Sequence, residues 1–400
     1  MTPADGPKRW LFFKERFAWP RASGHDVHTY YLMRALAGLG HTVSVATLDE
    51  PPAEALAGVP FARRFVLGGM PTPAAGTFPL RLTTSQAKFQ SYWGTPEESI
   101  RKLAAAAAEC DADVVVVSGL NVLPYLGAVA GRVRVWYAAD EWVWHHLSMA
   151  KLTKPGTWGE VKQGLVKGLY ERAYRGLMDR VWVVSDADAK AFKWLAGVRQ
   201  TDVLPNGVDA DHYAPDPAIV PEPNSCVFWG RLDFGPNIQA VEHFTRRIWP
   251  RVRAVVPDAK LHLYGFQPTP PVEAVAGRDG ITLTADLPDI RPAVRAAQVV
   301  VLPFVSGGGI KNKLLEACAL GVPVVATGRV RHGLSGRPPM VVCDRPADWV
   351  RALKLLFTEP GERASIGAAG RAWVVEHHTW AAAARTAAAG VAALGVGGRG

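Results

Sequence analysis

The fold of this chain is decided by the segment VVVLPFVSGGGIKNKLLEACALGVPVVA, residues 299–326. Residues 299–303 have the apolar run of a buried strand, residues 310–320 repeat apolar side chains at helical spacing, and Gly321 marks a helix end before a second strand at 324–327. Strand, glycine loop, helix and strand in this order predict an α/β fold with a parallel sheet covered by helices.

The loop and helix of this segment also predict a site for an anion. The first turn of a helix has unpaired N–H groups and a partial positive charge, so Lys311 and Lys313 are unfavourable there unless an anion binds at the same end. The glycines at 307–309 allow a ligand to approach the backbone, and a helix N-terminus suits a phosphate. We therefore expect a nucleoside diphosphate at this loop.

Helical spacing divides the side chains of this helix between two faces. The apolar side chains would face the sheet: Ile310, Leu314 and Cys318. Asn312, Lys313 and Glu316 would share another face, where a cation and a carboxylate meet the ligand. The alternative is that Lys313 and Glu316 form an ordinary surface pair beside an ordinary loop.

Length and composition indicate a globular protein with two domains. Four hundred residues exceed what one core usually holds, and 48% of them are hydrophobic. The net charge of +9 suits nucleic acid, an anionic membrane or anionic small substrates. Because the chain has no run of Lys and Arg and no nucleic-acid-binding motif, nucleic acid is the weakest of these partners.

Cysteine usage and hydropathy indicate a cytoplasmic protein. The four cysteines lie far apart without a CxxC motif, which fits reduced thiols. Residues 1–10 lack the pattern of a signal peptide, and no apolar run reaches about 18 residues. Any membrane contact would then be peripheral, at the inner face. The candidate for such a membrane contact is the basic stretch 151–175, which has an apolar side formed by Val161, Leu165, Leu169 and Tyr170. The alternative, an ordinary charged face of a domain helix, is more common.

The N-terminal half predicts two places for ligand contacts at strand ends. Residues 10–13, 27–39 and 41–47 form a strand-helix-strand unit, so Ser23, Gly24 and His25 lie in the loop after its first strand. A local capping or packing role for His25 is equally open. Asp140 follows the predicted strand 133–137 within a cluster of acidic, histidine and tryptophan residues, for which a solvated loop is the alternative. Residues 50–95 are too irregular to assign.

The C-terminal half repeats the alternation of strands and helices. The strand 226–232 runs into a loop with Arg231, whose guanidinium is able to donate two hydrogen bonds to a phosphate. Proline-rich residues 215–224 follow the first domain, and residues 380–394 predict a final alanine-rich helix. We divide the chain into residues 1–205, residues 206–375 and a C-terminal part, 376–400.

Several segments together resemble the retaining glycosyltransferases of family 4, which have the GT-B fold, and within them the sugar transferases of exopolysaccharide-type pathways. The segments are Gly24, Gly40-His41-Thr42-Val43, Val183-Val184-Ser185, Leu204-Pro205-Asn206-Gly207-Val208-Asp209, Gly230-Arg231-Leu232 and 308–327. The resemblance covers nearly the whole chain in the same order. It implies two facing Rossmann-like domains with a cleft between them, a donor held mainly by the second domain, and a C-terminal helix that crosses back to the first.

The same resemblance implies roles for individual residues. Arg231 and a lysine, preferably Lys313, would hold the diphosphate, and Glu316 would accept hydrogen bonds from the ribose. The residues expected to bind the donor are Gly24, Arg231, Gly265, Leu287, Gly308, Gly309, Ile310, Lys311, Lys313 and Glu316. The residues expected to take part in catalysis are His25, Asp140 and Arg231.

The chain departs from the family pattern at two positions. The family's paired glutamates, with seven residues between them, would place a carboxylate where this chain has Gly308. The lysine that commonly follows Gly-Arg-Leu would fall near Pro236, so its charge is missing. We expect Lys311 or Lys313 to replace that charge from another direction.

The resemblance implies a glycosyltransferase that moves a sugar, with retention, from a nucleotide-diphosphate-sugar donor to an acceptor hydroxyl on a sugar, a lipid-linked molecule or a small molecule. No metal or other cofactor is expected, and Asp111-Ala112-Asp113, which is similar to a metal-binding Asp-x-Asp, reads as a turn before a strand. One alternative is a non-catalytic nucleotide-sugar-binding protein or partner subunit on the same fold. A nicotinamide-dependent oxidoreductase is weaker, because no Gly-x-Gly-x-x-Gly follows the first strand.

Overall fold

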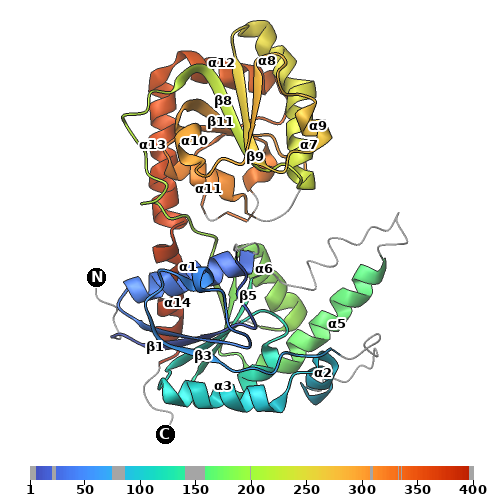
Figure 1. Ribbon diagram of the computed structural model, residues 1–400, viewed down its shortest axis with the longest axis vertical. Helices are drawn as coiled ribbons and strands as arrows, with labels where there is room; N and C mark the ends of the chain where they lie inside the picture. The colour runs from blue at the N-terminus through green and yellow to red at the C-terminus, as the bar shows by residue number, and fades with distance from the viewer. Residues whose placement is uncertain are drawn as a thin grey trace. The chain divides into compact units, whose positions relative to one another are not determined.

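The computed structural model describes residues 6–19, 24–73, 86–139, 158–198, 200–306, 310–331, 333–334 and 336–395. The chain divides into two units, here called unit 1 (Met1–Pro205 with Trp380–Gly400) and unit 2 (Asn206–Thr379). The boundaries predicted from the sequence fall after residues 205 and 375. Figure 1 shows that each unit is a sheet flanked by helices.

Unit 1 contains a seven-stranded parallel sheet in the order β3-β2-β1-β4-β5-β6-β7. Its strands are β1 Arg9–Phe13, β2 Thr42–Thr47, β3 Phe61–Val66, β4 Val114–Ser118, β5 Val133–Ala139, β6 Arg180–Val183 and β7 Thr201–Val203. Its helices are α1 Gly24–Gly38, α2 Gln86–Trp93, α3 Glu97–Glu109, α5 Trp158–Tyr174, α6 Asp186–Ala191 and α14 Trp380–Ala392. Shorter helical turns are η1 Ala53–Leu56, η2 Leu123–Val129, η4 Arg175–Leu177 and η5 Phe192–Ala196.

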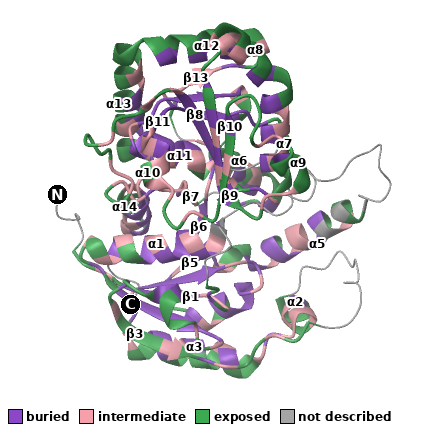
Figure 2. Ribbon diagram, turned by 45° about the horizontal axis from the view of Figure 1, so that its top comes forward, coloured by how far each residue is buried: buried purple, intermediate pink, exposed green. Residues whose placement is uncertain are grey.

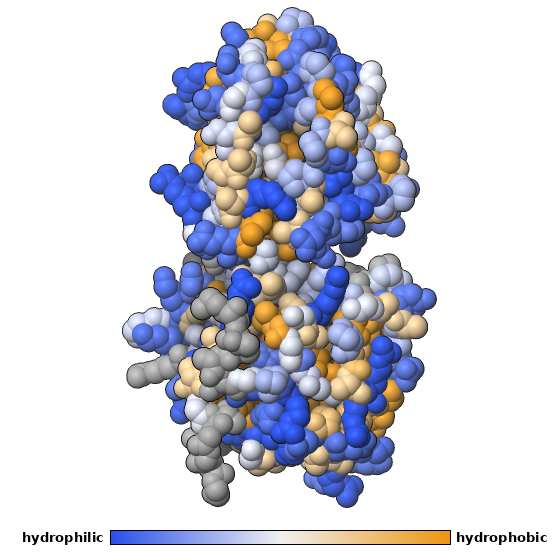
Figure 3. All heavy atoms as spheres, turned by 90° about the vertical axis from the view of Figure 1, so that its left-hand side faces the viewer, coloured by the Kyte–Doolittle hydropathy of each residue, from blue (hydrophilic) through white to orange (hydrophobic). Residues whose placement is uncertain are grey.

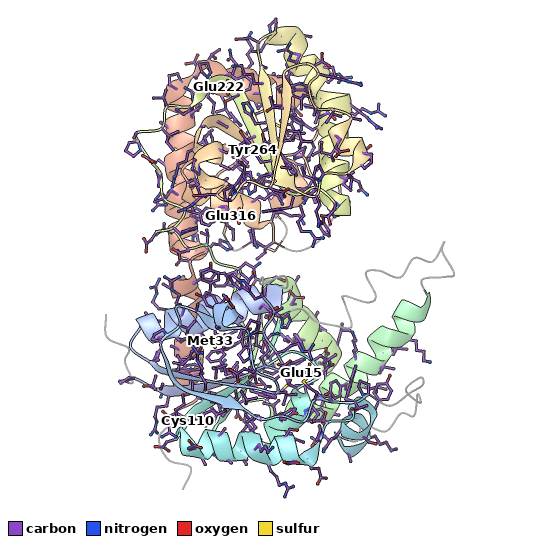
Figure 4. The ribbon with its side chains drawn as sticks, viewed as in Figure 1. Glu15, Met33, Cys110, Glu222, Tyr264 and Glu316 are labelled. Atoms are coloured by element: carbon purple, nitrogen blue, oxygen red, sulfur yellow. The ribbon has the colours of Figure 1, made fainter. Side chains whose placement is uncertain are left out.

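Side-chain alternation along β1 places helices on both faces of this sheet. Trp10 and Phe12 point into a core shared with Met33 of α1, which is labelled in Figure 4. Leu11 and Phe13 point to the opposite face, into a core shared with α3 and α5. A strand buried on both faces reads as a continuous apolar run, which is why residues 10–13 are recognisable from the sequence.

The unassigned stretch 50–95 contains β3 and α2, which the sequence analysis missed. β3 is the edge strand of the sheet, and most of its side chains are exposed. Arg63 and Arg64 interrupt its apolar pattern, as is common for edge strands that must not pair with another molecule. Residues Leu123–Val129 form a 3₁₀ helix, η2.

The last helix, α14, belongs to unit 1 although unit 2 precedes it in the chain. It packs against α1, where the Trp380 ring stacks on Tyr31 with 5.0 Å between ring centroids and an interplanar angle of 6°. The edge of the same indole meets the His28 ring at 5.2 Å. His28 in turn stacks on Tyr137 of β5 at 4.7 Å, so aromatic contacts connect α14 to the sheet.

Unit 2 contains a six-stranded parallel sheet in the order β10-β9-β8-β11-β12-β13. Its strands are β8 Glu222–Arg231, β9 Lys260–Phe266, β10 Ile281–Ala285, β11 Ala297–Leu302, β12 Val324–Ala326 and β13 Val341–Val342. Its helical elements are α7 Gly235–His243, η6 Phe244–Ile248, α8 Trp249–Val255, α9 Pro270–Glu273, α10 Arg291–Arg295, α11 Asn312–Ala319, η7 Gly328–Arg331, α12 Pro346–Thr358 and α13 Pro360–His377. The two parallel sheets confirm the predicted α/β class.

Burial follows this layering. Figure 2 shows buried strands inside each unit and exposed outer faces on the covering helices. On the face drawn in Figure 3, hydrophobic residues form scattered patches among hydrophilic ones. Of the helices in the described ranges, none has both the length and the apolar character needed to span a membrane.

We predict that Trp380→Ala lowers the free energy of unfolding of unit 1 by about 3–5 kcal/mol, because a buried aromatic side chain is removed between α14 and α1. Chemical denaturation followed by far-UV circular dichroism measures the change. Trp194→Ala is the matched control, since the Trp194 side chain is 78% exposed and its loss should change stability by less than about 0.5 kcal/mol. Equal effects of the two substitutions would contradict the docking of α14 through Trp380.

Candidate functional site

The strand order of unit 2 defines where a ligand is expected. β8 lies between β9 and β11, so the connections leaving β8 and β11 run in opposite directions along the sheet. A crevice forms at the carboxyl ends of parallel strands at such a switch point. Here β8 ends at Gly230 and Arg231, β11 ends at Leu302, and α11 begins at Asn312 close to both.

Lys313 carries a partly buried ammonium group at this point. Its Nζ donates a hydrogen bond to Oδ1 of Asn237 at 3.4 Å and lies 5.8 Å from the ring centroids of Phe228 and Phe304. Burial lowers the pKa of Lys313 to about 8, the nearby Glu316 carboxylate opposes this shift, and Lys311 adds to it. The site therefore holds a cation whose charge is incompletely compensated.

Gly230 leaves room for this lysine. A Cβ atom at residue 230 would lie 2.6 Å from both Cε and Nζ of Lys313, and the backbone there has φ +141°, which side chains rarely adopt. Residue 230 must therefore be a glycine for two reasons: its backbone has a positive φ, and a side chain there would overlap that of Lys313.

Glu316 lies one helical turn beyond Lys313 and also approaches β8. Its Oε2 accepts a hydrogen bond from the Trp229 indole Nε1 at 3.1 Å, and Figure 4 labels Glu316 in α11. Burial raises the pKa of Glu316, while Lys313 and the Trp229 hydrogen bond lower it. Lys313 and Glu316 are therefore not an ordinary surface pair, since each contacts a residue of another element.

The predicted grouping of Asn312 with these two residues is wrong. The Asn312 side chain is exposed and its Oδ1 accepts a hydrogen bond from Nδ2 of Asn206 at 3.1 Å. Asn312 is the first residue of α11, and its side chain contacts the segment that follows β7.

Arg231 directs both arms of its guanidinium to a carboxylate of its own chain. Nε and Nη2 donate to Oδ1 and Oδ2 of Asp233 at 3.1 and 2.7 Å, and the Arg231 side chain is 65% exposed. This arrangement lowers the pKa of Asp233. The backbone oxygen of Arg231 accepts from Nδ2 of Asn237 at 2.6 Å, so Asn237 connects Arg231 to Lys313. A phosphate would have to compete with Asp233 for the hydrogen bonds of the Arg231 guanidinium.

Other predicted donor residues lie near these strand ends. Gly265, the residue before the end of β9, pairs with Gly230, where a Cβ on Gly265 would meet the Gly230 oxygen at 1.8 Å. The backbone N–H of Asp286, the residue before Leu287, donates to the Gly265 oxygen at 3.0 Å. Ile310 packs against the core of unit 2. Lys311 Nζ lies 5.4 Å from the Phe304 ring centroid, and burial, with a smaller effect of Arg329, lowers the pKa of Lys311.

Some predicted residues cannot be placed. Gly308, Gly309, Asp140 and Ser23 lie outside the described residues. Gly24 is described, as the first residue of α1.

Unit 1 has its own switch point, between β1 and β4, and a pocket of about 480 Å³ lies there. Its lining includes Lys14, Glu15 and Arg16, which follow β1, together with Asn121, which follows β4, and Lys167 of α5. Burial raises the pKa of Glu15, against the effects of Lys14, Arg16 and a hydrogen bond with Asn121. Figure 4 labels Glu15 in this part of unit 1.

His25 also lines this pocket, from the first turn of α1. Its ring packs on Tyr137 with 5.1 Å between centroids. Burial and Lys14 lower the pKa of His25 to about 4, although Asp26 and a hydrogen bond to the backbone of Ala138 oppose the shift. Lys14 Nζ binds Oδ1 of Asp26 at 2.8 Å. The imidazole is therefore neutral at pH 7, and it both packs locally and faces a pocket.

The Asp111-Ala112-Asp113 segment is a turn, as expected. Asp111 has φ 49°, and Arg9 binds the side chains of both aspartates, with 2.7 Å from its Nη2 to Oδ1 of Asp113. Within the described part of the chain, no three His, Cys, Asp or Glu residues gather as a metal site would require.

Three residues that contact the candidate site residues were not predicted from the sequence: Trp229, Asp233 and Asn237. All three lie in the continuous run 229–237, which crosses the carboxyl end of β8 and the start of α7. The polar residues that follow Gly230-Arg231 were the available signal, because ligands bind beyond strand ends.

Comparison with known proteins gives consistent matches along the chain. The model of the family described as "Glycosyltransferase Family 4" matches residues 22–212, and that of "Glycosyl transferases group 1" matches residues 223–359. A GDP-mannose-dependent alpha-(1-6)-phosphatidylinositol monomannoside mannosyltransferase of Mycolicibacterium smegmatis is 30% identical over 204 residues, which are 44% of this chain and 52% of that protein. A protein of the same name from Mycobacterium tuberculosis H37Rv is 30% identical over 207 residues, 45% of this chain and 52% of that protein. The match thus spans about half the length of these relatives.

Solved structures share the fold over nearly the whole chain. Sucrose-phosphate synthase from Thermosynechococcus elongatus aligns with a TM-score of 0.62 at 15% identity, over 97% of this chain and 99% of that one. Anabaena HepE in complex with UDP-glucose aligns with a TM-score of 0.61 at 14% identity, over 96% of this chain and 100% of that one.

We predict that unit 1 loses stability as the pH falls from about 6.5 to 4, in part through His25. In this window the unfolded chain binds a proton at residue 25 that the folded unit does not, since the folded pKa is about 4. His25→Asn should therefore make the melting temperature less dependent on pH in this range, as measured by differential scanning calorimetry. His377→Asn in unit 2 is the control. An unchanged slope for His25→Asn would contradict the burial of a neutral imidazole.

Proposed function

Because this chain belongs to the family 4 glycosyltransferases, which have the GT-B fold, we propose that it transfers a sugar with retention from a nucleotide-diphosphate-sugar to an acceptor hydroxyl. The observation that carries the proposal is the partly buried Lys313 ammonium at the β8–β11 switch point, where it donates to Asn237 and lies near Glu316. A diphosphate there would supply the negative charge that this ammonium lacks.

The chemistry follows from these charges. When the bond between the sugar and the diphosphate breaks, negative charge grows on the leaving phosphate, and Lys313 and Arg231 stabilise it in a partly dehydrated site. The acceptor oxygen forms the new bond to the sugar, and its proton passes to the leaving phosphate oxygen. No metal is required for this charge balance, so we propose a metal-independent reaction. Unchanged turnover in EDTA, and a product whose anomeric configuration by NMR equals that of the donor, are the expected results.

For the donor, GDP-mannose is the first compound to test, because the curated relatives are named as GDP-mannose-dependent. We propose that Glu316 accepts hydrogen bonds from the ribose of the donor, while Trp229 holds one oxygen of the Glu316 carboxylate. Gly265 and Leu287 are proposed to border the base. Thermal shifts with GDP, UDP, ADP, TDP and CMP, each with and without magnesium, would identify the base.

We propose that the pocket of unit 1 holds the acceptor. His25 and Glu15 offer hydrogen-bonding groups to a hydroxylated molecule, and the basic residues Lys14, Arg16 and Lys167 favour one that carries an anionic group. Asp140 stays a proposed catalytic residue on this side. Arg16→Ala should raise the KM for a phosphate-bearing acceptor more than that for a neutral one.

A cytoplasmic protein in peripheral contact with the inner membrane face agrees with this acceptor class, because the named relatives act on phosphatidylinositol mannosides. On α5 the predicted apolar side is split, since Tyr170 is buried whereas Leu165 is 52% exposed and Val161 is exposed too. The exposed pair, beside Lys162, is the proposed contact with an anionic lipid surface. The alternative of a non-catalytic binding protein rests on Gly308, and none of the comparisons supports it.

Lys313→Ala and Glu316→Ala should each weaken binding of the nucleoside diphosphate about 10- to 100-fold, the size expected for a hydrogen bond to a charged group of about 1.5–3 kcal/mol. Isothermal titration calorimetry measures the affinity. Lys354→Ala, which removes an exposed lysine of the same unit, is the matched control. If both site variants bind the nucleoside diphosphate with wild-type affinity, the proposed position of the donor is wrong.

Arg231→Ala should reduce turnover of the nucleotide sugar more than it reduces affinity for the nucleoside monophosphate. The reason is that the guanidinium is proposed to stabilise the negative charge that develops on the leaving diphosphate. Initial rates and calorimetric titration of the monophosphate give the two quantities. The reverse order of losses would contradict the assignment of Arg231.

A further inference from the structure

Asn237 is adjacent in sequence to the position where the family pattern has a lysine and this chain has none. The family's lysine would fall near Pro236, and the next residue, Asn237, is 3% exposed in the first turn of α7. Its Oδ1 accepts from Lys313 Nζ at 3.4 Å, so an ammonium does reach this point, from α11 instead of α7.

Two features of β8 and α7 direct the Lys313 side chain along this path. Gly230 has no Cβ to obstruct its end, since such an atom would come within 2.6 Å of Cε and Nζ. Asn237 is itself held, because its Nδ2 donates to the Arg231 backbone oxygen at 2.6 Å. One amide thus fixes the end of Lys313 and the loop that carries Arg231.

We propose that Asn237 is a positioning residue that holds the Lys313 ammonium at the diphosphate site, so that α11 supplies there the cation that α7 does not carry. This inference rests on the proposed function of the site. If this is so, binding of the diphosphate depends on where the positive charge lies and not on which helix supplies it.

The charged groups around this ammonium are few. Glu316 and Lys311 act on it from α11 and the turn before it, whereas its contacts from β8, α7 and the segment after β11 are with Phe228, Asn237 and Phe304. A change in the charge of residue 237 should therefore act directly on the protonation of Lys313.

The first test moves the cation between helices. Lys313→Ala should weaken binding of GDP and UDP about 10- to 100-fold, and the double variant Asn237→Lys, Lys313→Ala should recover at least about tenfold of that loss. Asn237→Lys alone places two ammonium groups together and should not improve on the wild type. Thermal unfolding shows whether the double variant is folded. If it is folded and binds GDP and UDP no better than Lys313→Ala does, the proposal is overturned.

The second test does not depend on the folding of the double variant. Between pH 7 and 9.5 the diphosphate stays ionised, so wild-type affinity should fall as the pH rises through about 8 and Lys313 loses its proton. Asn237→Asp should move this midpoint upward, because a carboxylate stabilises the ammonium, and Asn237→Ala should move it downward. Lys311→Gln should keep a fall in affinity with pH, and Lys354→Ala, which removes an exposed lysine of the same unit, should leave the midpoint unchanged.

The outcomes separate the two proposals. If the wild type binds neither GDP nor UDP, the proposed donor site is wrong and this inference falls with it. If the wild type binds but Asn237→Asp and Asn237→Ala lose affinity with an unmoved midpoint, Asn237 supports only the local fold, and the inference alone is overturned.

Discussion

The structure of unit 2 depends on one constraint, the accommodation of an ammonium group away from bulk water. An unpaired buried charge is unfavourable, and proteins respond by pairing the charge or by shifting its pKa. Lys313 shows both responses, since an amide and a nearby carboxylate face it and its pKa still falls to about 8. The glycine at 230 follows from the same constraint, because a side chain there would displace the lysine. A dianionic ligand would complete the compensation.

Both units place their polar groups according to the same topological rule. In each sheet the first strand in the chain lies centrally, and the connections on its two sides run in opposite directions. The side chains beyond its carboxyl end differ in kind, however. After β1 the chain has Lys14, Glu15 and Arg16 around a pocket, whereas β8 itself ends in a glycine and an arginine bound to Asp233. The same architecture therefore presents groups of different chemistry at the two switch points.

The sequence predicted those parts that leave a periodic or motif signal, and failed where tertiary contacts decide. The buried strands were recognisable from their apolar runs. β3 was missed because an edge strand needs few apolar residues, and two arginines mask its pattern. Helical periodicity grouped Asn312 with Lys313, but position at the first residue of α11 turned Asn312 toward Asn206. The pairing of Arg231 with Asp233 was equally invisible, since a motif identifies a residue without its partner in the free protein.

The order of the elements along the chain has a consequence for biosynthesis. Unit 2 is inserted into unit 1, because Asn206–Thr379 precede the helix that completes the earlier unit. During translation all residues of unit 2 leave the ribosome before Trp380, so unit 2 is able to fold while the α1 surface around His28 and Tyr31 still lacks its cover. During that interval this aromatic surface is not covered by α14. The packing of unit 1 is therefore completed only after residues 380–392 have been synthesised.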